Sequence, residues 1–165
     1  MWQTLSVTRK IGEAQARAYI HAEIAGIELS QVENKDGSNV KFIVQMNLIN
    51  SGATPAHSIV ILYDIQEADR GIFPINLLND GQRSTETLNF IPSGESNPMR
   101  LSRVWHSENT EALIVGKDRY VRLTYVIKFV DEFGSDRETS LTSGTFHKFE
   151  GHLAFFPDKL AYVEG

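Results

Sequence analysis

Hydrophobic and polar residues alternate with a period of two through most of the chain after residue 17. Such alternation is typical of a half-buried β-strand, because successive side chains of a strand point to opposite faces of the sheet. The clearest run covers residues 40–48, where the polar positions include Lys41, Gln45 and Asn47. We predict that its apolar positions face a core: Val40, Phe42, Val44, Met46 and Leu48.

The same alternation recurs in several other segments. The first run changes phase at Ala25-Gly26, and one extra residue beside a glycine predicts a β-bulge. Residues 84–90 are polar and rich in threonine, so we predict that they form an edge strand. The remaining strand candidates are residues 18–24, 59–65, 99–105, 112–115, 121–129 and the segment from 137 to 149.

These runs are separated by turn residues, and no helical pattern lies between them. The pattern predicts an all-β fold, an antiparallel immunoglobulin-like β-sandwich of about seven to nine strands. Residues 1–17 lack the alternation and contain helix formers around Glu13 to Ala16. We predict a short N-terminal helix there, a lead-in that precedes a β-sandwich domain over residues 18–165.

Composition narrows the possible functions. The chain has 165 residues, which predicts one domain, and it contains no cysteine. Disulfides, thiol catalysis and cysteine-ligated zinc are therefore excluded. The net charge of −5 argues against binding to nucleic acid, which requires a basic surface.

Several residue clusters invite a chemical interpretation, but a structural one fits each of them better. His147 and His152 are five residues apart, so on a regular strand they point to opposite faces and only Glu150 shares a side with His152. Two ligands do not make a zinc site, and we predict no bound metal. The acidic segment containing Asp131 and Glu132 lacks the spacing of a calcium loop, and we predict a hairpin turn.

Catalytic motifs are absent from the sequence. It contains no Gly-x-Ser-x-Gly nucleophile elbow and no glycine-rich phosphate-binding loop. We therefore predict that the protein is not an enzyme and uses no cofactor. Trp105, Phe155 and Phe156 are candidates for a binding surface, although large aromatic residues more often belong to a core or its cap.

The polar positions of the run at 121–129 are the best candidates for a ligand site. Arg122 and Lys128 carry positive charge and Thr124 lies between them, so these side chains suit an anionic ligand if they face a pocket. The alternative, which we favour, is that they form a solvated face of the sheet.

The segment Asn50-Ser51-Gly52-Ala53-Thr54-Pro55-Ala56 joins two predicted strands. We expect Asn50 to hydrogen-bond the backbone two residues further on and Gly52 to adopt a positive φ. Pro55 fixes the entry into the next strand and forces Thr54 into an extended conformation. The segment is predicted to be a structural corner.

This corner resembles the Asn-Thr-Gly-x-Thr-Pro-Ala segment of a large set of bacterial membrane-anchored β-sandwich proteins to which no activity is assigned. Three other pieces match in order. Trp2-Gln3-Thr4 with residues 11–19 is similar to the stretch that leads from a membrane helix into the first strand. Residues 91–96 are similar to a Pro-Gly turn. Residues 125–134 resemble a Tyr-x-Asp-x-Phe-Gly segment, with Asp131, Phe133 and Gly134 at its end.

The resemblance implies an immunoglobulin-like sandwich that is held at a membrane through a segment upstream of Met1, with the periplasmic side favoured over the cytoplasm. Our first hypothesis is a non-catalytic module that binds a protein or a cell-envelope component. An edge strand such as residues 84–90 offers backbone groups to which a partner can add a strand. The alternative is a sensor of a small anionic ligand, and the second alternative is a hydrolase or metalloenzyme.

Overall fold

The computed structural model of the chain describes residues 12, 16–34, 37–69, 83–106, 119–139, 141–149 and 152–157. These residues contain nine strands and form no helix of regular length. The strands are β1 (Ile20–Asn34), β2 (Gly37–Asn50), β3 (Ala56–Asp69), β4 (Ser84–Ile91), β5 (Ser96–His106), β6 (Arg119–Asp131), β7 (Asp136–Glu138), β8 (Thr142–Phe149) and β9 (His152–Pro157).

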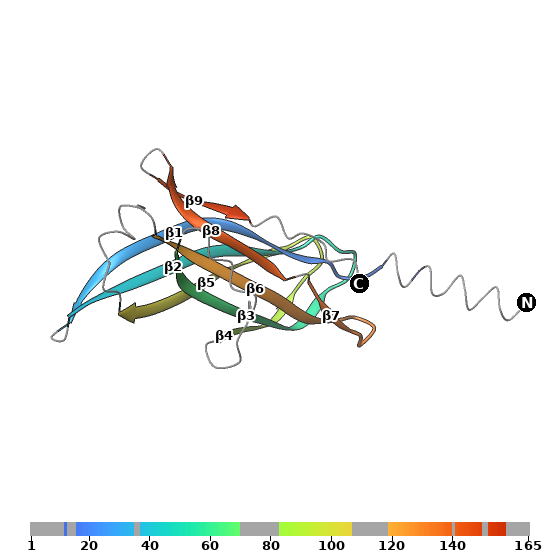
Figure 1. Cartoon of the computed structure of the whole chain (residues 1–165). Coiled ribbons are helices and arrows are strands. Elements are labelled where there is room, and N and C mark those ends of the chain that lie inside the picture. The colour runs from blue at the N-terminus through green and yellow to red at the C-terminus, as the bar shows by residue number, and fades with distance from the viewer. Residues whose placement is uncertain are drawn as a thin grey trace, which may run out of the picture.

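The strands form two antiparallel sheets that lie as layers over one another (Figure 1). The three-stranded sheet has the order β1-β2-β5. The six-stranded sheet has the order β4-β3-β6-β8-β9, with β7 paired to β6 as well. Every strand pair is antiparallel. The predicted all-β antiparallel sandwich is therefore confirmed.

A hydrophobic core fills the space between the two sheets. The apolar face predicted for β2 is buried in it, and Val40, Phe42, Val44 and Leu48 have no exposed surface. The Phe42 ring lies 4.9 Å from the ring of Phe146 in the opposite sheet, measured between centroids. Further core residues come from β3, β5 and β6: Ile59, Ile61, Tyr63, Ile65, Leu101, Val121, Leu123, Tyr125, Ile127 and Phe129.

Two β-bulges interrupt the regular pairing. The first lies between Ile24 and Gly26, where the register with β2 shifts, and it confirms the bulge predicted from the change of phase. The second lies between His57 and Val60, where β3 shifts against β6. Within it, Ser58 has a φ of 48°, which is uncommon for a residue other than glycine. The alternation along β3 did not predict this second bulge.

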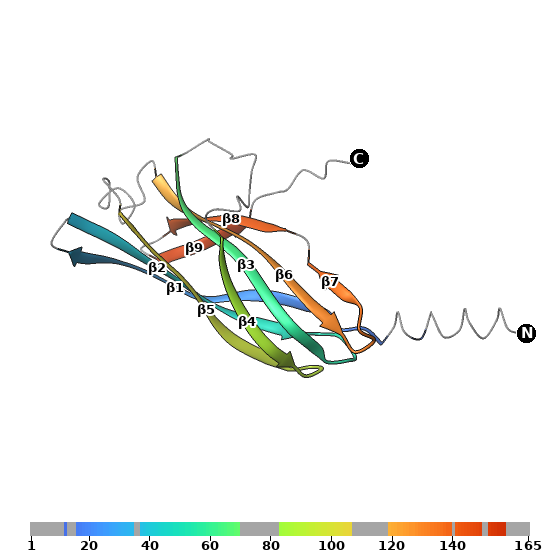
Figure 2. The same cartoon turned by 90° about the horizontal axis from the view of Figure 1, so that it is seen from below.

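Edge positions are also clear. β4 begins the six-stranded sheet and pairs only with β3 among the described strands, so the predicted edge strand is confirmed. β5 ends the three-stranded sheet on the same side of the sandwich, and Figure 2 shows β4 and β5 side by side. The two strands are joined by the short turn at residues 92–95.

Some sequence-based predictions fall where the structure gives no description. The predicted N-terminal helix falls mostly outside the described residues. Gly12 and Ala16 are described, and Ala16 N donates a hydrogen bond to Gly12 O at 3.0 Å. The strand candidate at 112–115 also lies outside them. Within the described residues, no helix has the length and apolar character needed to span a bilayer.

Candidate functional site

Three loops and the start of the domain meet at one end of the sandwich. This lead-in end consists of residues 16–19, the corner 50–56, the turn 91–95 and the turn 131–135, and Figure 2 shows the loops together at that end. The strand register explains the meeting, because Ala56 lies directly opposite both Ile91 of β4 and Asp131 of β6. Segments that are far apart in the sequence are thus neighbours.

Asn50 is the central residue of the lead-in end. Its side chain is completely buried and makes four hydrogen bonds, two through each polar atom. Nδ2 donates to the carbonyl oxygens of Thr54 at 2.8 Å and Ile91 at 3.2 Å. Oδ1 accepts from the backbone N–H groups of Gly52 at 3.0 Å and Tyr19 at 3.2 Å. A primary amide offers two donors and two acceptor sites, so Asn50 is fully satisfied.

Backbone hydrogen bonds tie the lead-in to the corner. Ser51 N donates to Tyr19 O at 2.9 Å, and Ala53 N donates to Arg17 O at 3.1 Å. The turn at 91–95 is bound to the same corner, since Ser93 Oγ donates to Gly52 O at 2.6 Å. The described lead-in residues are therefore packed on the domain as an added piece of backbone.

Gly52 is required here for a reason that differs from the prediction. The expected positive φ is wrong, because the described glycines with positive φ are Gly94 and Gly134. A Cβ at Gly52 would lie 2.2 Å from Arg17 O and 2.5 Å from Tyr19 N. The lead-in backbone thus approaches so closely that no side chain fits at this position.

The other corner residues surround Asn50 and Gly52. Ala56 has no exposed surface, and Pro55 is half-buried immediately before β3 begins. The Thr54 hydroxyl is buried and forms no hydrogen bond within the described part of the chain.

Asp131 organises the turn between β6 and β7. Its carboxylate is buried, and Oδ1 accepts from Phe133 N at 3.0 Å and Ser135 N at 2.9 Å. Oδ2 accepts from Arg137 Nε at 3.0 Å. Gly134, with a φ of 73°, closes the turn by donating its N–H to Asp131 O at 2.9 Å. The carboxylate is occupied by the protein itself, which leaves it poorly suited to a calcium ion.

The pKa values of two buried groups move away from neutrality. Burial by itself raises the pKa of the Asp131 carboxyl, but hydrogen bonds from Ser135, Arg137 and Phe133 and the Arg137 charge outweigh it and hold the pKa below the usual 3.8. Burial raises the pKa of the Tyr125 hydroxyl above its usual 10.0, against the opposing effect of a hydrogen bond with Thr142. Neither group is tuned for proton transfer at neutral pH.

Exposed aromatic side chains gather at the lead-in end. Tyr19, Phe90 and Phe133 are 56%, 43% and 46% exposed. Tyr19 and Phe133 belong to the lead-in end, and Phe90 immediately precedes the turn at 91–95. The Phe90 ring lies 5.1 Å from the His57 ring, and His57 Nε2 lies 3.0 Å from Glu132 Oε2. The other exposed large apolar residues of the described part, Val104 and Phe156, lie on β5 and β9.

The structure does not bring Arg122 and Lys128 together. They lie six residues apart on β6, which separates them by about 20 Å. Lys128 is exposed, as predicted for a solvated face, but that prediction is wrong for Arg122 and Thr124, which are buried. Thr124 Oγ1 lies 3.2 Å from Ser143 Oγ on β8. The outer face of the six-stranded sheet thus contains buried polar groups that periodicity alone did not indicate.

A groove of about 550 Å³ surrounds Lys128 on the same outer face. It is lined by the Ser58 bulge, by β6 and by all three residues of β7. Lys128 Nζ lies 3.2 Å from Glu138 Oε2, and Arg137 is bound to Asp131. Both cations of the groove are neutralised by carboxylates of the protein, which weighs against an anionic ligand there.

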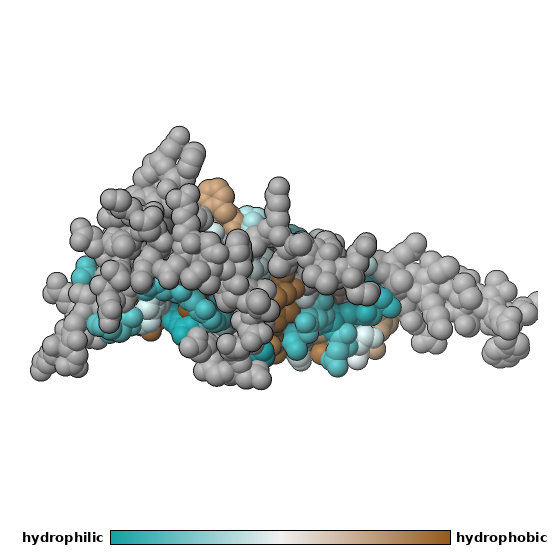
Figure 3. Space-filling view, in the orientation of Figure 1, coloured by the Kyte–Doolittle hydropathy of each residue, from teal (hydrophilic) through white to brown (hydrophobic). Residues whose placement is uncertain are grey.

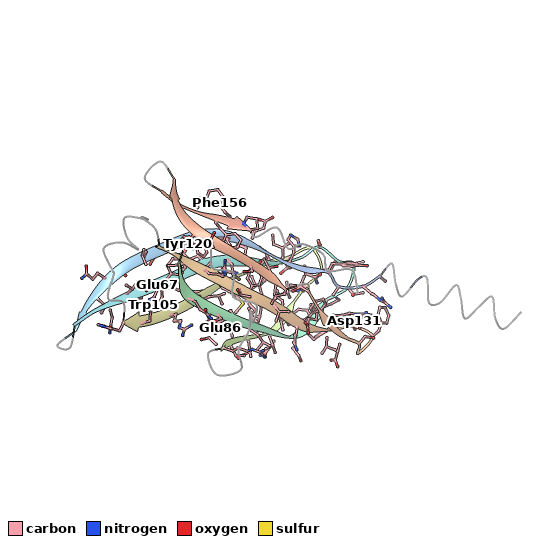
Figure 4. The ribbon with its side chains drawn as sticks, viewed as in Figure 1. Glu67, Glu86, Trp105, Tyr120, Asp131 and Phe156 are labelled. Carbon is pink, nitrogen blue, oxygen red and sulfur yellow. The ribbon has the colours of Figure 1, made fainter. Side chains whose placement is uncertain are left out.

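The side of the sandwich formed by β4 and β5 contains polar residues that the sequence analysis missed. Arg103 of β5 crosses to the other sheet, where it forms an ion pair with buried Asp64 and donates to Ile65 O at 2.6 Å. Trp105 Nε1 donates to Glu67 Oε2 at 3.3 Å. These contacts lie far along β3 from Asp131, and Figure 4 shows Glu67 and Trp105 together, away from Asp131.

Glu86 was also missed. It lies directly opposite core residue Ile61 and therefore points to the inner face of β4, where it is half-buried. A signal was present in the sequence, because Glu86 alternates in phase with Leu88 within the predicted edge strand.

Other candidate residues have simpler outcomes. Trp105 and Phe155 pack against the core, whereas Phe156 is exposed. The side chains of His147 and His152, and the whole of Glu150, lie outside the described residues. Among the residues that are described, no group of three or more metal-ligating side chains is found.

Comparison with known proteins adds only a weak structural likeness. No family model matches the chain, and no curated protein matches it. A solved structure described as the X-ray structure of Northeast Structural Genomics Consortium target SoR45 aligns with a TM-score of 0.49 and 14% sequence identity. The alignment covers 88% of this chain and 92% of that one. At this level the likeness carries no information about function.

Proposed function

We propose that this protein is a non-catalytic interaction module that binds a partner protein or cell-envelope component through the free edge of β4. The observation that carries the proposal is that β4 pairs only with β3 among the described strands. Backbone N–H and C=O groups on the other side of an edge strand can accept a strand from a partner. The main buried polar groups, Asn50 and Asp131, are in contrast occupied by contacts within the fold.

The strand order supports an immunoglobulin-like arrangement for this module. β1, β2 and β5 lie in one sheet, and β4, β3, β6 and β8 follow one another in the other. Sandwiches of this class carry their contacts on strand edges and on loops at the two ends. The surface is polar enough for such a module, since Figure 3 shows hydrophilic residues over most of the described part of one face, with apolar residues confined to small patches.

Photo-crosslinking tests the binding edge. A photoreactive amino acid in place of exposed Thr85 on β4 should give an adduct with a partner in host cells. The matched control replaces exposed Ser30 on β1, at the opposite edge of the sandwich. Equal adduct yields from Thr85 and Ser30 would contradict the assignment of β4 as the binding edge.

We also propose that the module is bacterial and works at a membrane, held there through a segment joined to its lead-in, with the lead-in end toward the lipid and the periplasmic side favoured. The resemblance of the corner and turn segments supports this, and so does the position of Tyr19, Phe90 and Phe133. Aromatic side chains are favoured at the boundary between lipid and water, where an apolar ring and a polar surrounding are both accommodated.

Fractionation of host cells tests the membrane assignment. The tagged protein should be recovered with membranes, and replacing Tyr19, Phe90 and Phe133 by serine should lower that recovery. The matched control replaces Val104 and Phe156, which are exposed to a similar degree at other places. If the two variants behave alike, the lead-in end does not contact the membrane.

A further inference from the structure

The four sheet edges of the described sandwich are protected to different degrees. β1 carries a bulge at Gly26, and it meets β9 at a groove lined by Ile24, Ile27 and Phe155 among others. β5 contains Pro98, which lacks an N–H group, and β9 is short and ends at Pro157. β4 has neither a proline nor a lysine along its eight residues. Natural sheets use such devices against unwanted pairing, and on β4 the one device of this kind is a charged residue that points inward, Glu86.

The uncovered half of β3 is closed in a different way. β4 pairs with β3 only as far as Ser84, which lies opposite Tyr63, and β3 continues to Asp69 without β4 beside it. There the Arg103 side chain donates a hydrogen bond to the carbonyl oxygen of Ile65. The side chain of an adjacent strand therefore takes the place of a neighbour along β3, whereas β4 has no such cover among the described residues.

Glu86 is the one charged residue of β4, and it faces inward. Within the described residues it has no hydrogen-bond or ion-pair partner. Its side chain is only half-buried, so part of it reaches water. A partner strand laid against β4 would cover that part, and burial of an unpaired carboxylate is costly. An apolar or acidic residue opposite Glu86 is therefore strongly disfavoured.

A basic residue on the partner strand opposite Glu86 removes the cost of burying the carboxylate, because the two side chains can form an ion pair. Directly opposed side chains on paired strands have Cβ atoms about 5 Å apart, which is within reach of an ion pair. The net charge of −5 on the whole chain also attracts a basic segment over a longer range. On the outer face of β4, Thr85 and Thr87 are exposed and suit small β-branched or hydroxyl residues on the partner.

We propose that β4 pairs with an extended segment of a partner protein that places a lysine or arginine opposite Glu86, so that this ion pair selects the partner. The inference rests on the proposed function, because it specifies the chemistry of the strand that the module accepts. Glu86 thereby serves two purposes. It disfavours indiscriminate strand addition, and it admits a strand of matching charge.

Synthetic peptides with blocked ends test the proposal in a fluorescence anisotropy titration against the full chain. The probe Thr-Val-Thr-Lys-Thr-Val-Thr alternates apolar and hydroxyl residues and has its lysine on the valine face. The second peptide has glutamate in place of that lysine. The third, Thr-Val-Lys-Thr-Thr-Val-Thr, keeps the charge but moves it to the other face. We expect the first to bind about tenfold more tightly than either of the others.

Variants of the protein separate the local ion pair from general electrostatics. Glu86→Lys should reverse the preference between the lysine and glutamate peptides, and Glu86→Gln should abolish it. Glu95→Lys is the matched control, because Glu95 is an exposed residue of the neighbouring turn and the net charge changes equally. It should leave the preference in place. Reversal by Glu95→Lys as well would overturn the role of Glu86.

An N-methylated version of the lysine peptide separates the two levels of the proposal. If all three unmodified peptides bind equally and N-methylation abolishes binding, strand addition stands and selection by Glu86 is wrong. If no peptide binds at a concentration of about 1 mM, which would detect even weak binding, both strand addition at β4 and selection by Glu86 are wrong. If sedimentation shows a dimer of the protein that Glu86→Lys disrupts, the edge belongs to a second copy of the chain and the proposal fails.

Discussion

At the lead-in end, the side chains of Asn50 and Asp131 accept or donate hydrogen bonds at every polar atom, and their partners come from four separate segments. At the β4 edge, Glu86 is half-buried and has no described partner, and among the described strands β4 has a neighbour on one side only. Saturated buried groups hold a structure in one arrangement, whereas unused groups at an edge are available to another molecule.

The comparison separates two ways in which a residue can be important in the same domain. The residues of the corner and the acidic turn, including Gly52 and Asp131, are explained by the internal architecture of the lead-in end. The binding role is proposed for β4, which shares with that end only Ile91, its last position. Substitutions should therefore act on stability at the lead-in end and on binding at the edge.

The largest effect is expected for Gly52→Val. The added side chain would clash with the Arg17 carbonyl oxygen and the Tyr19 backbone nitrogen. Neither of these backbone atoms can move without displacing the lead-in. We expect a loss of about 4 kcal/mol in the free energy of unfolding, measured by urea denaturation. Gly94→Ala is the control, because Gly94 has a positive φ but open space around it and should lose only about 1 kcal/mol. Equal losses would show that close approach is not the cause.

Asn50→Ala should follow, with a loss of about 3 kcal/mol. The substitution leaves the buried carbonyls of Thr54 and Ile91 without their donor and removes the acceptor of two N–H groups. Thermal and urea unfolding both measure it. The corresponding change at Asn89, an exposed residue of β4, should cost less than about 0.5 kcal/mol. A small loss at Asn50 would mean that water replaces these bonds.

Asp131→Asn should cost about 2 kcal/mol at neutral pH, because the charged contact with Arg137 is lost while an acceptor oxygen remains. The pKa of Asp131 is lowered in the folded state, so its stabilisation is complete above the unfolded pKa near 3.8 and is lost as the pH falls through the lower folded pKa. The difference between the two proteins should thus narrow in acid. A difference that stays constant down to the acid transition would contradict the lowered pKa.

The smallest effect on stability is expected at the edge. Glu86→Lys should change the free energy of unfolding by no more than about 0.5 kcal/mol, because the residue lies at an open edge and has no described partner to lose. The same substitution should change peptide preference strongly. If it unfolds the protein instead, Glu86 is part of the packing of the sandwich and the contrast between the two regions fails.

Much of the fold could be predicted from local patterns. Alternation, phase and composition over a few residues predicted the buried faces of β2, β3 and β6, the bulge near Gly26 and the edge position of residues 84–90. The second bulge at Ser58 could not be predicted, because the apolar residues around it keep a regular spacing.

The candidate site was predicted less completely. The corner and the acidic turn stood out as separate segments, but nothing in the sequence placed Ala56 beside Asp131 or brought Tyr19 to Asn50 across 31 positions. The inward face of Glu86 was readable from its phase with Leu88, but only the strand pairing placed it directly opposite core residue Ile61.

The sequence by itself determined that this protein consists of antiparallel strands, which residues of those strands face the core and which segment is an exposed edge. These are properties of neighbouring residues, since a strand alternates its faces whatever it pairs with. The tertiary structure alone decided that Arg122 and Thr124 are buried and that Gly52 is needed for the close approach of the lead-in. Those outcomes depend on contacts between segments distant in the chain, and such contacts leave no periodic trace in any one of them.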